Sequence, residues 1–144
     1  MYKALAKGGV GTIITGMVGI DGSSRVSPIM LSAYGEFYVP ELRMVADALH
    51  ALQCNLVVQL SHCGRKATCI DSAGLPLGPS EVTDENGTLV AAMTPEDIAA
   101  VTASLADAAA KSKEAGADAG QLHWGHGYLL RQCLSAYCNK RNEA

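Results

Sequence analysis

The chain has 144 residues and a net charge of −3, from 11 basic and 14 acidic side chains. This length suits one domain with its own core and leaves little room for a second. The negative balance argues against a binder of nucleic acid or of anionic membranes, because either would require a basic face. The longest nearly apolar stretch, residues 10–20, holds eleven residues, whereas a membrane-spanning helix needs about twenty.

The cysteines and the N-terminus indicate the compartment. Five cysteines occur at irregular spacing without a C-x-x-C pair. This pattern favours reduced thiols over a disulfide framework. The first nine residues, MYKALAKGG, contain no apolar segment of the length found in secretory signals. We therefore expect a cytoplasmic protein.

Short apolar runs along the chain predict three strands. Residues 10–15 form a β-branched run after two glycines, and residues 55–60 form a second run. Both are continuous rather than alternating, which is typical of strands buried on both faces of a parallel sheet. Residues 117–123 are the third expected strand, weaker in propensity but directly after a helical pattern and a glycine.

Two helices are expected between these strands. Residues 40–53 carry apolar side chains at spacings of three and four, as an amphipathic helix does. The second helix should begin at Thr94, with Pro95 in its first turn, and should end at Gly116. The order strand, helix, strand, helix, strand predicts an α/β fold with a parallel sheet and right-handed crossovers.

Long segments follow the first two strands, at residues 16–39 and 61–93. Segments of this length without secondary structure are usually functional when they occur inside a compact domain. Both begin at the carboxyl ends of strands, where α/β folds place their sites. We therefore expect these loops to contribute to a site.

The densest group of reactive side chains is His123, His126 and Tyr128, within six residues past the third strand. Separate structural roles for the three side chains are one interpretation, but their clustering at a strand end favours a site. Histidines three apart could also chelate zinc on one helical turn. Gly125 and Gly127 disfavour such a turn and no third ligand has a recognisable spacing, so we predict no metal site.

Gln59 ends the second strand with a side-chain amide that can both donate and accept hydrogen bonds, which suits the edge of a heterocycle. His62, Gly64 and Arg65 open the loop that follows. Their plain interpretation is a turn with a solvated cation. The glycine-rich segments near the N-terminus match neither a Rossmann nor a P-loop pattern.

Several segments, in order, resemble the Old Yellow Enzyme family of FMN-dependent oxidoreductases, which includes NADH:flavin oxidoreductases and 2,4-dienoyl-CoA reductases. Each match is weak alone, but their ordered succession covers nearly the whole chain. The matching segments are residues 8–15, 59–67, 78–80, 94–96, 114–118, 123–132 and 135–141.

This resemblance implies a (β/α)8 TIM barrel, of which the chain corresponds approximately to strands 2–4 with their loops and helices. A complete barrel takes ~250 residues. Residues 1–144 are therefore expected to form an incomplete FMN-oxidoreductase barrel domain. It would be the N-terminal half without strand 1 and strands 5–8, from a fragment or a truncated gene.

The resemblance also implies roles for individual residues. Tyr128 would be the proton donor, and His123 and His126 would grip the carbonyl or nitro oxygen of the substrate. Gln59 would bind the pyrimidine edge of FMN, and Met17 would lie where the backbone approaches the flavin. No metal is implied.

The implied reaction begins with reduction of FMN by NADH or NADPH. The flavin N5 would then pass hydride to an activated alkene, a small enone or a dienoyl thioester. A homo-oligomer is compatible with these expectations. The alternative is a non-catalytic, truncated fragment of such an enzyme that does not bind flavin independently.

Overall fold

The computed structural model describes residues 1–70, 74–84 and 86–142. Its centre is a four-stranded sheet in which every neighbouring pair of strands is parallel. Across the sheet the strands are β2 (Leu31–Ser32), β1 (Thr12–Gly19), β3 (Asn55–Ser61) and β7 (Ala119–Leu122). The three expected strands and their parallel pairing are thus confirmed, and β2 is an addition.

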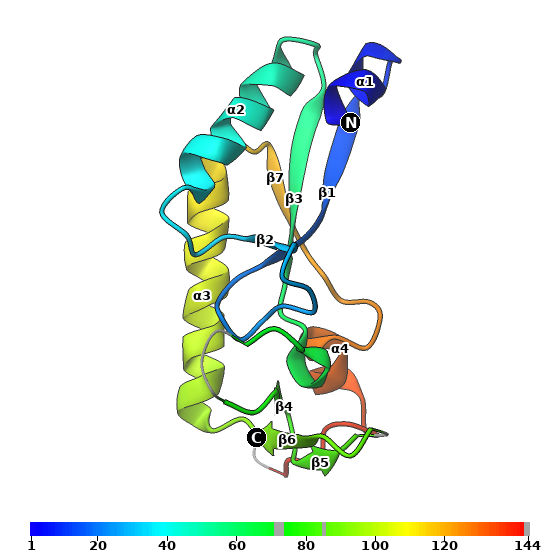
Figure 1. The fold of residues 1–144 in the computed structure, drawn as a ribbon, viewed down its shortest axis with the longest axis vertical. Coiled ribbons are helices and arrows are strands. Elements are labelled where there is room, and N and C mark those ends of the chain that lie inside the picture. Colours follow the sequence, from blue (N-terminus) through cyan, green and yellow to red (C-terminus); the bar gives the residue numbers. More distant parts are fainter. Residues whose placement is uncertain (71–73, 85, 143–144) are drawn as a thin grey trace.

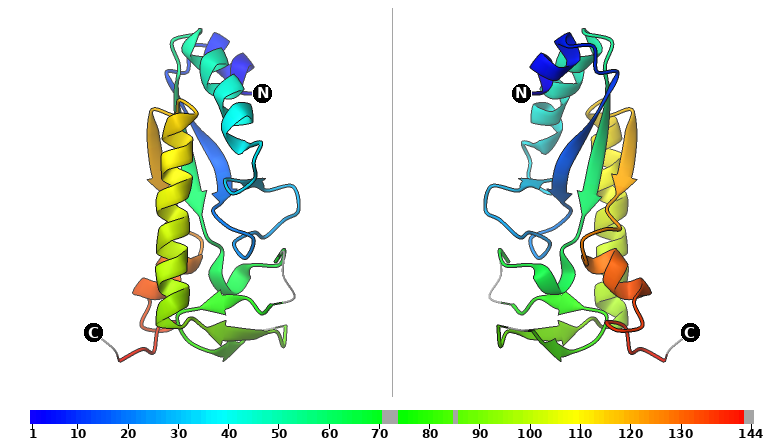
Figure 2. Two further views of the ribbon diagram at one scale, coloured as in Figure 1. Left: turned by 90° about the vertical axis from the view of Figure 1, so that its left-hand side faces the viewer. Right: turned by 90° about the vertical axis from the view of Figure 1, so that its right-hand side faces the viewer.

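Two long helices, α2 (Tyr38–His50) and α3 (Pro95–Glu114), lie side by side against one face of the sheet (Figures 1 and 2). Both were expected from the sequence. Thr94 caps α3 in a capping box, in which its Oγ1 accepts from the Asp97 N–H at 3.1 Å and the Asp97 carboxylate accepts from the Thr94 N–H at 2.8 Å. Beyond the last helical residue, Gly116 has φ +95°.

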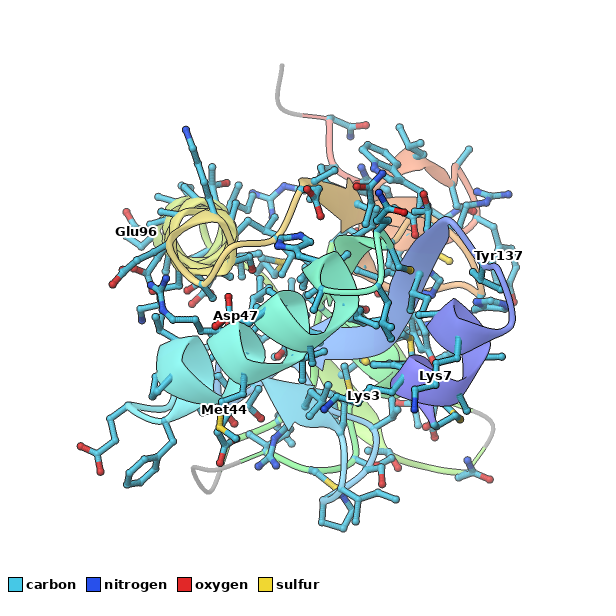
Figure 3. All side chains as sticks on the ribbon, turned by 90° about the horizontal axis from the view of Figure 1, so that it is seen from above. Lys3, Lys7, Met44, Asp47, Glu96 and Tyr137 are labelled. Atoms are coloured by element: carbon cyan, nitrogen blue, oxygen red, sulfur yellow. The ribbon has the colours of Figure 1, made fainter. Side chains whose placement is uncertain are left out.

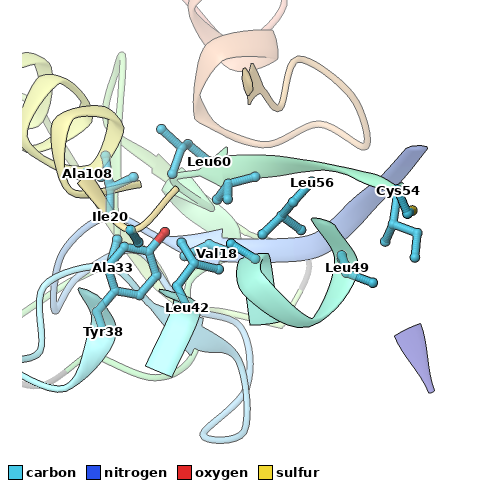
Figure 4. Packing of buried hydrophobic residues seen from close by; sticks show 14 of the residues in the cluster. Val18, Ile20, Ala33, Tyr38, Leu42, Leu49, Cys54, Leu56, Leu60 and Ala108 are labelled. Atoms are coloured by element: carbon cyan, nitrogen blue, oxygen red, sulfur yellow. The ribbon is translucent and has the colours of Figure 1, made fainter. Parts of the chain in front are cut away.

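The core lies between these helices and the sheet (Figure 4). Leu56, Val58 and Leu60 of β3 alternate toward it and are almost fully buried, and Leu49 of α2 meets them. The intervening residues of β3 are not buried. The expectation that the strands are buried on both faces was therefore wrong, because α2 and α3 cover only one face.

Strand β1 extends beyond the expected Thr15 to Gly19. Its pairing with β3 shifts by one residue between Ile14 and Met17, so the strand contains a β-bulge at Thr15 and Gly16. The Thr15 hydroxyl accepts the backbone N–H of Gln59 at 3.0 Å inside this bulge. Gly16 and Met17, expected at the start of a loop, are therefore strand residues.

The segment after β3 is not the irregular loop that its sequence indicated. It contains the 3₁₀ turn η1 (Gly64–Lys66) and a small second sheet at the end of the molecule opposite α1 (Tyr2–Lys7) (Figure 1). A further short helix, α4 (Leu129–Leu134), follows β7. The strands of the small sheet, in order, are β4 (Leu77–Gly78), β6 (Leu89–Ala92) and β5 (Val82–Thr83).

No helix in the described part of the chain is both long enough and apolar enough to cross a membrane. All five cysteines are unpaired thiols, and Cys54 and Cys63 are buried.

Candidate active site

The loops after β1, β3 and β7 meet at the carboxyl ends of these parallel strands. The backbone N–H of His123 continues the ladder beyond β7 by donating to the Leu60 carbonyl at 2.9 Å. The backbone N–H of Leu129 donates to the His62 carbonyl at 3.0 Å, which ties the two later loops together. Side chains that follow separate strands are thereby brought to one edge of the sheet.

His123, His126 and Tyr128 form one cluster of rings. His126 Nδ1 lies 3.1 Å from His123 Nε2. The ring of Tyr128 has its centroid 5.2 Å from that of His123 and 6.2 Å from that of His126. The sequence expected these three residues in one site, and the structure brings them into mutual contact.

The backbone turn between the rings explains this contact. His126 has φ +55° and Gly127 has φ +70°, so two successive residues adopt the left-handed conformation. A non-glycine residue with this conformation is uncommon and strained. The turn reverses the chain between His123 and Tyr128 and sets the His126 ring on the same side as its neighbours.

Burial sets the protonation of the cluster. Loss of solvent lowers the pKa of His123, and the nearby positive charge of His126 lowers it further. Burial raises the pKa of Tyr128, and the negative charge of the Cys63 sulfur, when ionised, adds to that rise. At neutral pH, His123 is therefore a neutral ring and the Tyr128 phenol retains its proton.

Lys66, at the end of η1, completes the cluster and was not anticipated from the sequence. Its Nζ donates to the His126 carbonyl at 2.8 Å and lies 5.8 Å from the centroid of the Tyr128 ring. The contact joins residues 60 positions apart. The only related signal in the sequence is the run of basic residues after Gly64.

A second row of side chains crosses the sheet next to the ring cluster. The pairing register sets Met17 opposite Gln59, and Gln59 opposite Gln121. Gln59 Nε2 donates to Gln121 Oε1 at 2.6 Å, and Met17 Sδ lies 4.0 Å from Ser61 Oγ. The bulge in β1 turns Met17 toward this face, as bulges near active sites commonly do.

His123 follows Gln121 by two residues and lies just beyond the end of β7. The structure therefore places Met17, Gln59 and Gln121 in one row across the sheet, and along β7 this row ends two residues before His123. Among the described residues, no hydrogen bond joins Gln59 to His123, His126 or Tyr128.

Gln132 of α4 holds the two later loops in register and was not singled out from the sequence. Its side chain is 1% exposed. The amide nitrogen donates to the carbonyls of Gly127, at 2.7 Å, and Cys63, at 3.3 Å, and the amide oxygen accepts the Arg65 N–H at 3.2 Å. One buried side chain thus fixes the turn that carries His126 and Tyr128.

The turn expected after His62 is present as η1, and no signal in the sequence indicated that the His62 side chain itself is buried. Its Nδ1 accepts the Gly64 N–H at 3.0 Å, so the ring proton resides on Nε2, 3.2 Å from Ser23 Oγ. Burial lowers the pKa of His62, and the Asp21 carboxylate partly offsets this effect. His62 therefore connects the loops after β1 and β3 as a neutral ring.

Within the described residues, no group of three or more His, Cys, Asp or Glu side chains could hold a metal ion. The two histidines of the cluster are thus without a third ligand of that kind. Their 3.1 Å nitrogen–nitrogen separation is that of a hydrogen bond.

A family model of the NADH:flavin oxidoreductase / NADH oxidase family matches residues 1–144, so the chain belongs to this family. Among curated relatives, the NADPH dehydrogenase of Listeria welshimeri is 34% identical over 143 residues, which are 99% of this chain and 41% of the relative. The metal reductase of Desulforamulus reducens is 35% identical over 149 residues, 99% of this chain and 21% of the relative. The chain spans about two fifths of the length of the NADPH dehydrogenases.

Solved structures agree with the family. A 2-naphthoyl-CoA reductase complex matches with a TM-score of 0.90 and 25% identity, over 99% of this chain and 24% of that chain. Histamine dehydrogenase from Rhizobium sp. 4-9 matches with a TM-score of 0.89 and 27% identity, over 99% of this chain and 23% of that chain. An Old Yellow Enzyme homologue from Zymomonas mobilis matches with a TM-score of 0.85 and 22% identity, over 99% of this chain and 42% of that chain. The fold is thus part of a TIM barrel, as expected, with an open parallel sheet.

The Gln59 row fits the pyrimidine edge of a flavin, which alternates carbonyl acceptors with an N–H donor. Because Gln59 Nε2 and Gln121 Oε1 bind each other, Gln59 Oε1 and Gln121 Nε2 remain as an acceptor and a donor on the open face. A Cβ added to Gly16, in the same bulge as Thr15, would meet nothing within 4 Å. The backbone there is open to a flat ring.

Proposed function

We propose that this chain forms the flavin- and substrate-binding part of an FMN-dependent NAD(P)H oxidoreductase that reduces an activated alkene of the enone or dienoyl type. The contact between the His123 and His126 rings beside Tyr128 is the observation that carries the proposal. The NADPH dehydrogenase relatives favour NADPH as the electron donor. In this proposal β1, β3 and β7 correspond to barrel strands 2–4, within a domain that lacks strand 1 and strands 5–8.

His123 and His126 would hold the substrate oxygen. Hydride addition to an enone drives negative charge onto that oxygen, and preorganised N–H donors stabilise such a charge. Their mutual hydrogen bond and the burial of His123 keep the imidazoles oriented before substrate arrives. Loss of one such donor typically lowers the rate by about 10²–10³.

Tyr128 would supply the proton that completes the reduction. Burial keeps its pKa raised, so the phenol is protonated at neutral pH. FMN, when bound, supplies the hydride. A positioned acid typically contributes about 10²–10⁴ in rate, so Tyr128→Phe should lower turnover in this range and leave flavin binding unchanged.

Gln59 would hold the flavin through its amide, with Met17 beside it on the neighbouring strand. The register that aligns Met17, Gln59 and Gln121 supports this role. Cofactor orientation is the main contribution that a protein makes to flavin chemistry. The row would thus bind the flavin, and the ring cluster would bind the substrate.

The alternative is a non-catalytic fragment of such an enzyme that does not bind flavin on its own. The open face around the row and the share of the relatives that the chain spans both support this alternative. The two proposals differ in one measurable property, which is the affinity of the 144-residue chain for FMN.

Titration of FMN with the chain, followed by quenching of flavin fluorescence, separates them. We expect saturable binding that Gln59→Leu weakens at least tenfold, because an apolar side chain cannot pair with the pyrimidine edge. Asn55→Leu, on the same strand and the same face, is the control and should leave the affinity unchanged. An absence of FMN binding by the unaltered chain would establish the alternative.

A further inference from the structure

Two adjoining cavities lie beside the ring cluster, at the end of the molecule that carries the small sheet. The larger has a volume of about 800 Å³ and lies between η1 and strand β5. The smaller, of about 300 Å³, lies between η1 and α4. Arg65 and Tyr137 line both cavities, which therefore adjoin, and the two together are called the depression.

Cationic side chains dominate this depression. Lys66 lines the larger cavity, Arg131 lines the smaller, and Arg65 lines both. None of these three side chains forms an ion pair with a described residue. In a chain of net charge −3, three cations around one depression, each without an ion pair to the part of the chain that the structure describes, favour an anionic ligand.

Asp84 is the only carboxylate among the described residues that line the cavities. Its Oδ1 accepts the backbone N–H groups of Asn86, at 2.9 Å, and Thr88, at 2.8 Å. The carboxylate is thus engaged within its own turn. The described lining therefore retains a net positive charge.

Tyr137 adds an aromatic surface to the cationic one. Its ring is 80% exposed and stands at the junction of the two cavities. Figure 3 shows Tyr137 at the periphery of the molecule. An exposed ring beside arginines provides a stacking platform for a nucleobase, and planar guanidinium groups bind phosphate through paired hydrogen bonds.

Lys66 connects the depression to the ring cluster. It lines the larger cavity, and its Nζ donates to the His126 carbonyl at 2.8 Å. Gly127, the next residue, lines the smaller cavity. A ligand with its reactive end at His123 and His126 could therefore extend past Lys66 into the depression.

We propose that the depression lined by Arg65, Lys66, Arg131 and Tyr137 binds the phosphate-bearing adenine nucleotide end of a ligand whose reactive end lies at the histidine pair. The position of the reactive end rests on the proposed function. A pyridine dinucleotide donor and an acyl-coenzyme A substrate both carry such an end. The arginines and Lys66 bind the phosphates, and Tyr137 stacks on the base.

Isothermal titration of the 144-residue chain with NADPH, NADH, coenzyme A and inorganic pyrophosphate tests this assignment. We expect binding that weakens with added salt. The double variant Arg65→Gln/Arg131→Gln should raise the Kd about tenfold for each arginine, because each charge-assisted contact with phosphate is lost. Lys3→Gln/Lys7→Gln removes two charges from α1, at the opposite end of the molecule from the small sheet (Figure 1), and should leave the Kd unchanged.

The tyrosine has its own pair of variants. Tyr137→Ala should weaken NADPH, NADH and coenzyme A by about tenfold and leave pyrophosphate unaffected, because stacking needs a base. Tyr137→Phe keeps the ring and should retain the original affinity. Tighter binding of NADPH or NADH identifies a dinucleotide, and tighter binding of coenzyme A identifies a thioester ligand.

The proposal is overturned if none of the four probes binds at millimolar concentration, or if the arginine and lysine double variants weaken binding equally. FMN titration of the same samples keeps the two proposals apart. Failure of flavin binding with intact nucleotide binding would reject the proposed function alone. The reverse result would reject only the nucleotide site.

Discussion

Gly64 and Gln132 approach so closely that a Cβ on Gly64 would lie 2.5 Å from Oε1 of Gln132. The glycine also has φ +60°, a conformation that other residues adopt with strain. Two independent physical reasons therefore require glycine at this position. Because Gln132 in turn holds Gly127, this contact bears on the geometry of the ring cluster.

Gly64→Ala should destabilise the chain more than Gly87→Ala. Gly87 also has a positive φ, of +81°, but nothing lies within 4 Å of a Cβ placed there. The control thus measures backbone strain alone, about 1–2 kcal/mol, whereas Gly64→Ala adds an overpacking cost of about 1–3 kcal/mol. Urea unfolding of both variants checks this, and equal losses would show that Gln132 moves aside freely.

Thr15→Val should test the bulge that presents Met17. Valine keeps the shape but removes the hydroxyl that accepts the Gln59 N–H, leaving a donor unpaired at a cost of about 1–3 kcal/mol. Thr12→Val, at an exposed position of the same strand, is the matched control. Free energies of unfolding from urea titration give the comparison, and a stable Thr15→Val chain would mean that the bulge has another source.

The stability of the chain should fall between about pH 7 and pH 5. Burial lowers the pKa of both His62 and His123 in the folded chain. As the pH drops through the ordinary histidine value of about 6.5, the unfolded chain takes up protons first, so the free energy of unfolding decreases. Denaturant titrations at pH 7.5 and 5.5 measure this.

Two variants test which histidines cause this dependence of stability on pH. His62→Gln should flatten the dependence, since one of the buried rings is gone. His50→Gln replaces an exposed histidine that contacts Asp118 and should preserve the decrease. If His50→Gln alone abolished it, the buried rings would not be its origin.

Thr94→Ala should remove the capping box of α3 and lower the free energy of unfolding by about 0.5–2 kcal/mol. Thr102→Ala lies in the middle of the same helix, where the hydroxyl only donates to the Ile98 carbonyl. Alanine is the better helix former there, so this control should cost less or stabilise the helix. Thermal unfolding of the two variants ranks them, and a larger loss at Thr102 would contradict the role of the cap.

Cys63 should resist alkylation in the folded chain. Burial raises the pKa of this thiol to about 11, so little reactive thiolate exists at pH 8. Cys133 is exposed and should react earlier, although burial raises its pKa as well. Mass spectrometry after brief iodoacetamide treatment, with and without urea, follows both sites. Equal labelling without urea would indicate that the loop after β3 opens readily.

Local patterns in the sequence were sufficient to predict features whose contacts join residues close together in the chain. The start of α3 at Thr94 was predicted, although its capping box with Asp97 was not. The close spacing of His123, His126 and Tyr128 predicted their shared site, because a single turn brings them together. The α/β order likewise followed from apolar runs and helix periodicity.

Long-range contacts account for what the sequence analysis missed. The bulge at Thr15 depends on the Gln59 backbone, 44 positions away. Gln132 binds loop residues as many as 69 positions earlier in the chain. The strands of the small sheet are two to four residues long, too short for their alternation to be read.

Strand β7 forms one border of the sheet, and all four of its residues are exposed. On its outer side it has no hydrogen-bonded strand among the described residues, so its N–H and C=O groups point outward at regular intervals. Such a border is a template for further β-pairing between molecules. At high concentration the chain should therefore self-associate through backbone pairing along β7. The Asp118 N–H donates to the Leu56 carbonyl of β3, so the next N–H, of Ala119, points outward, and a proline introduced at Ala119 should suppress that association.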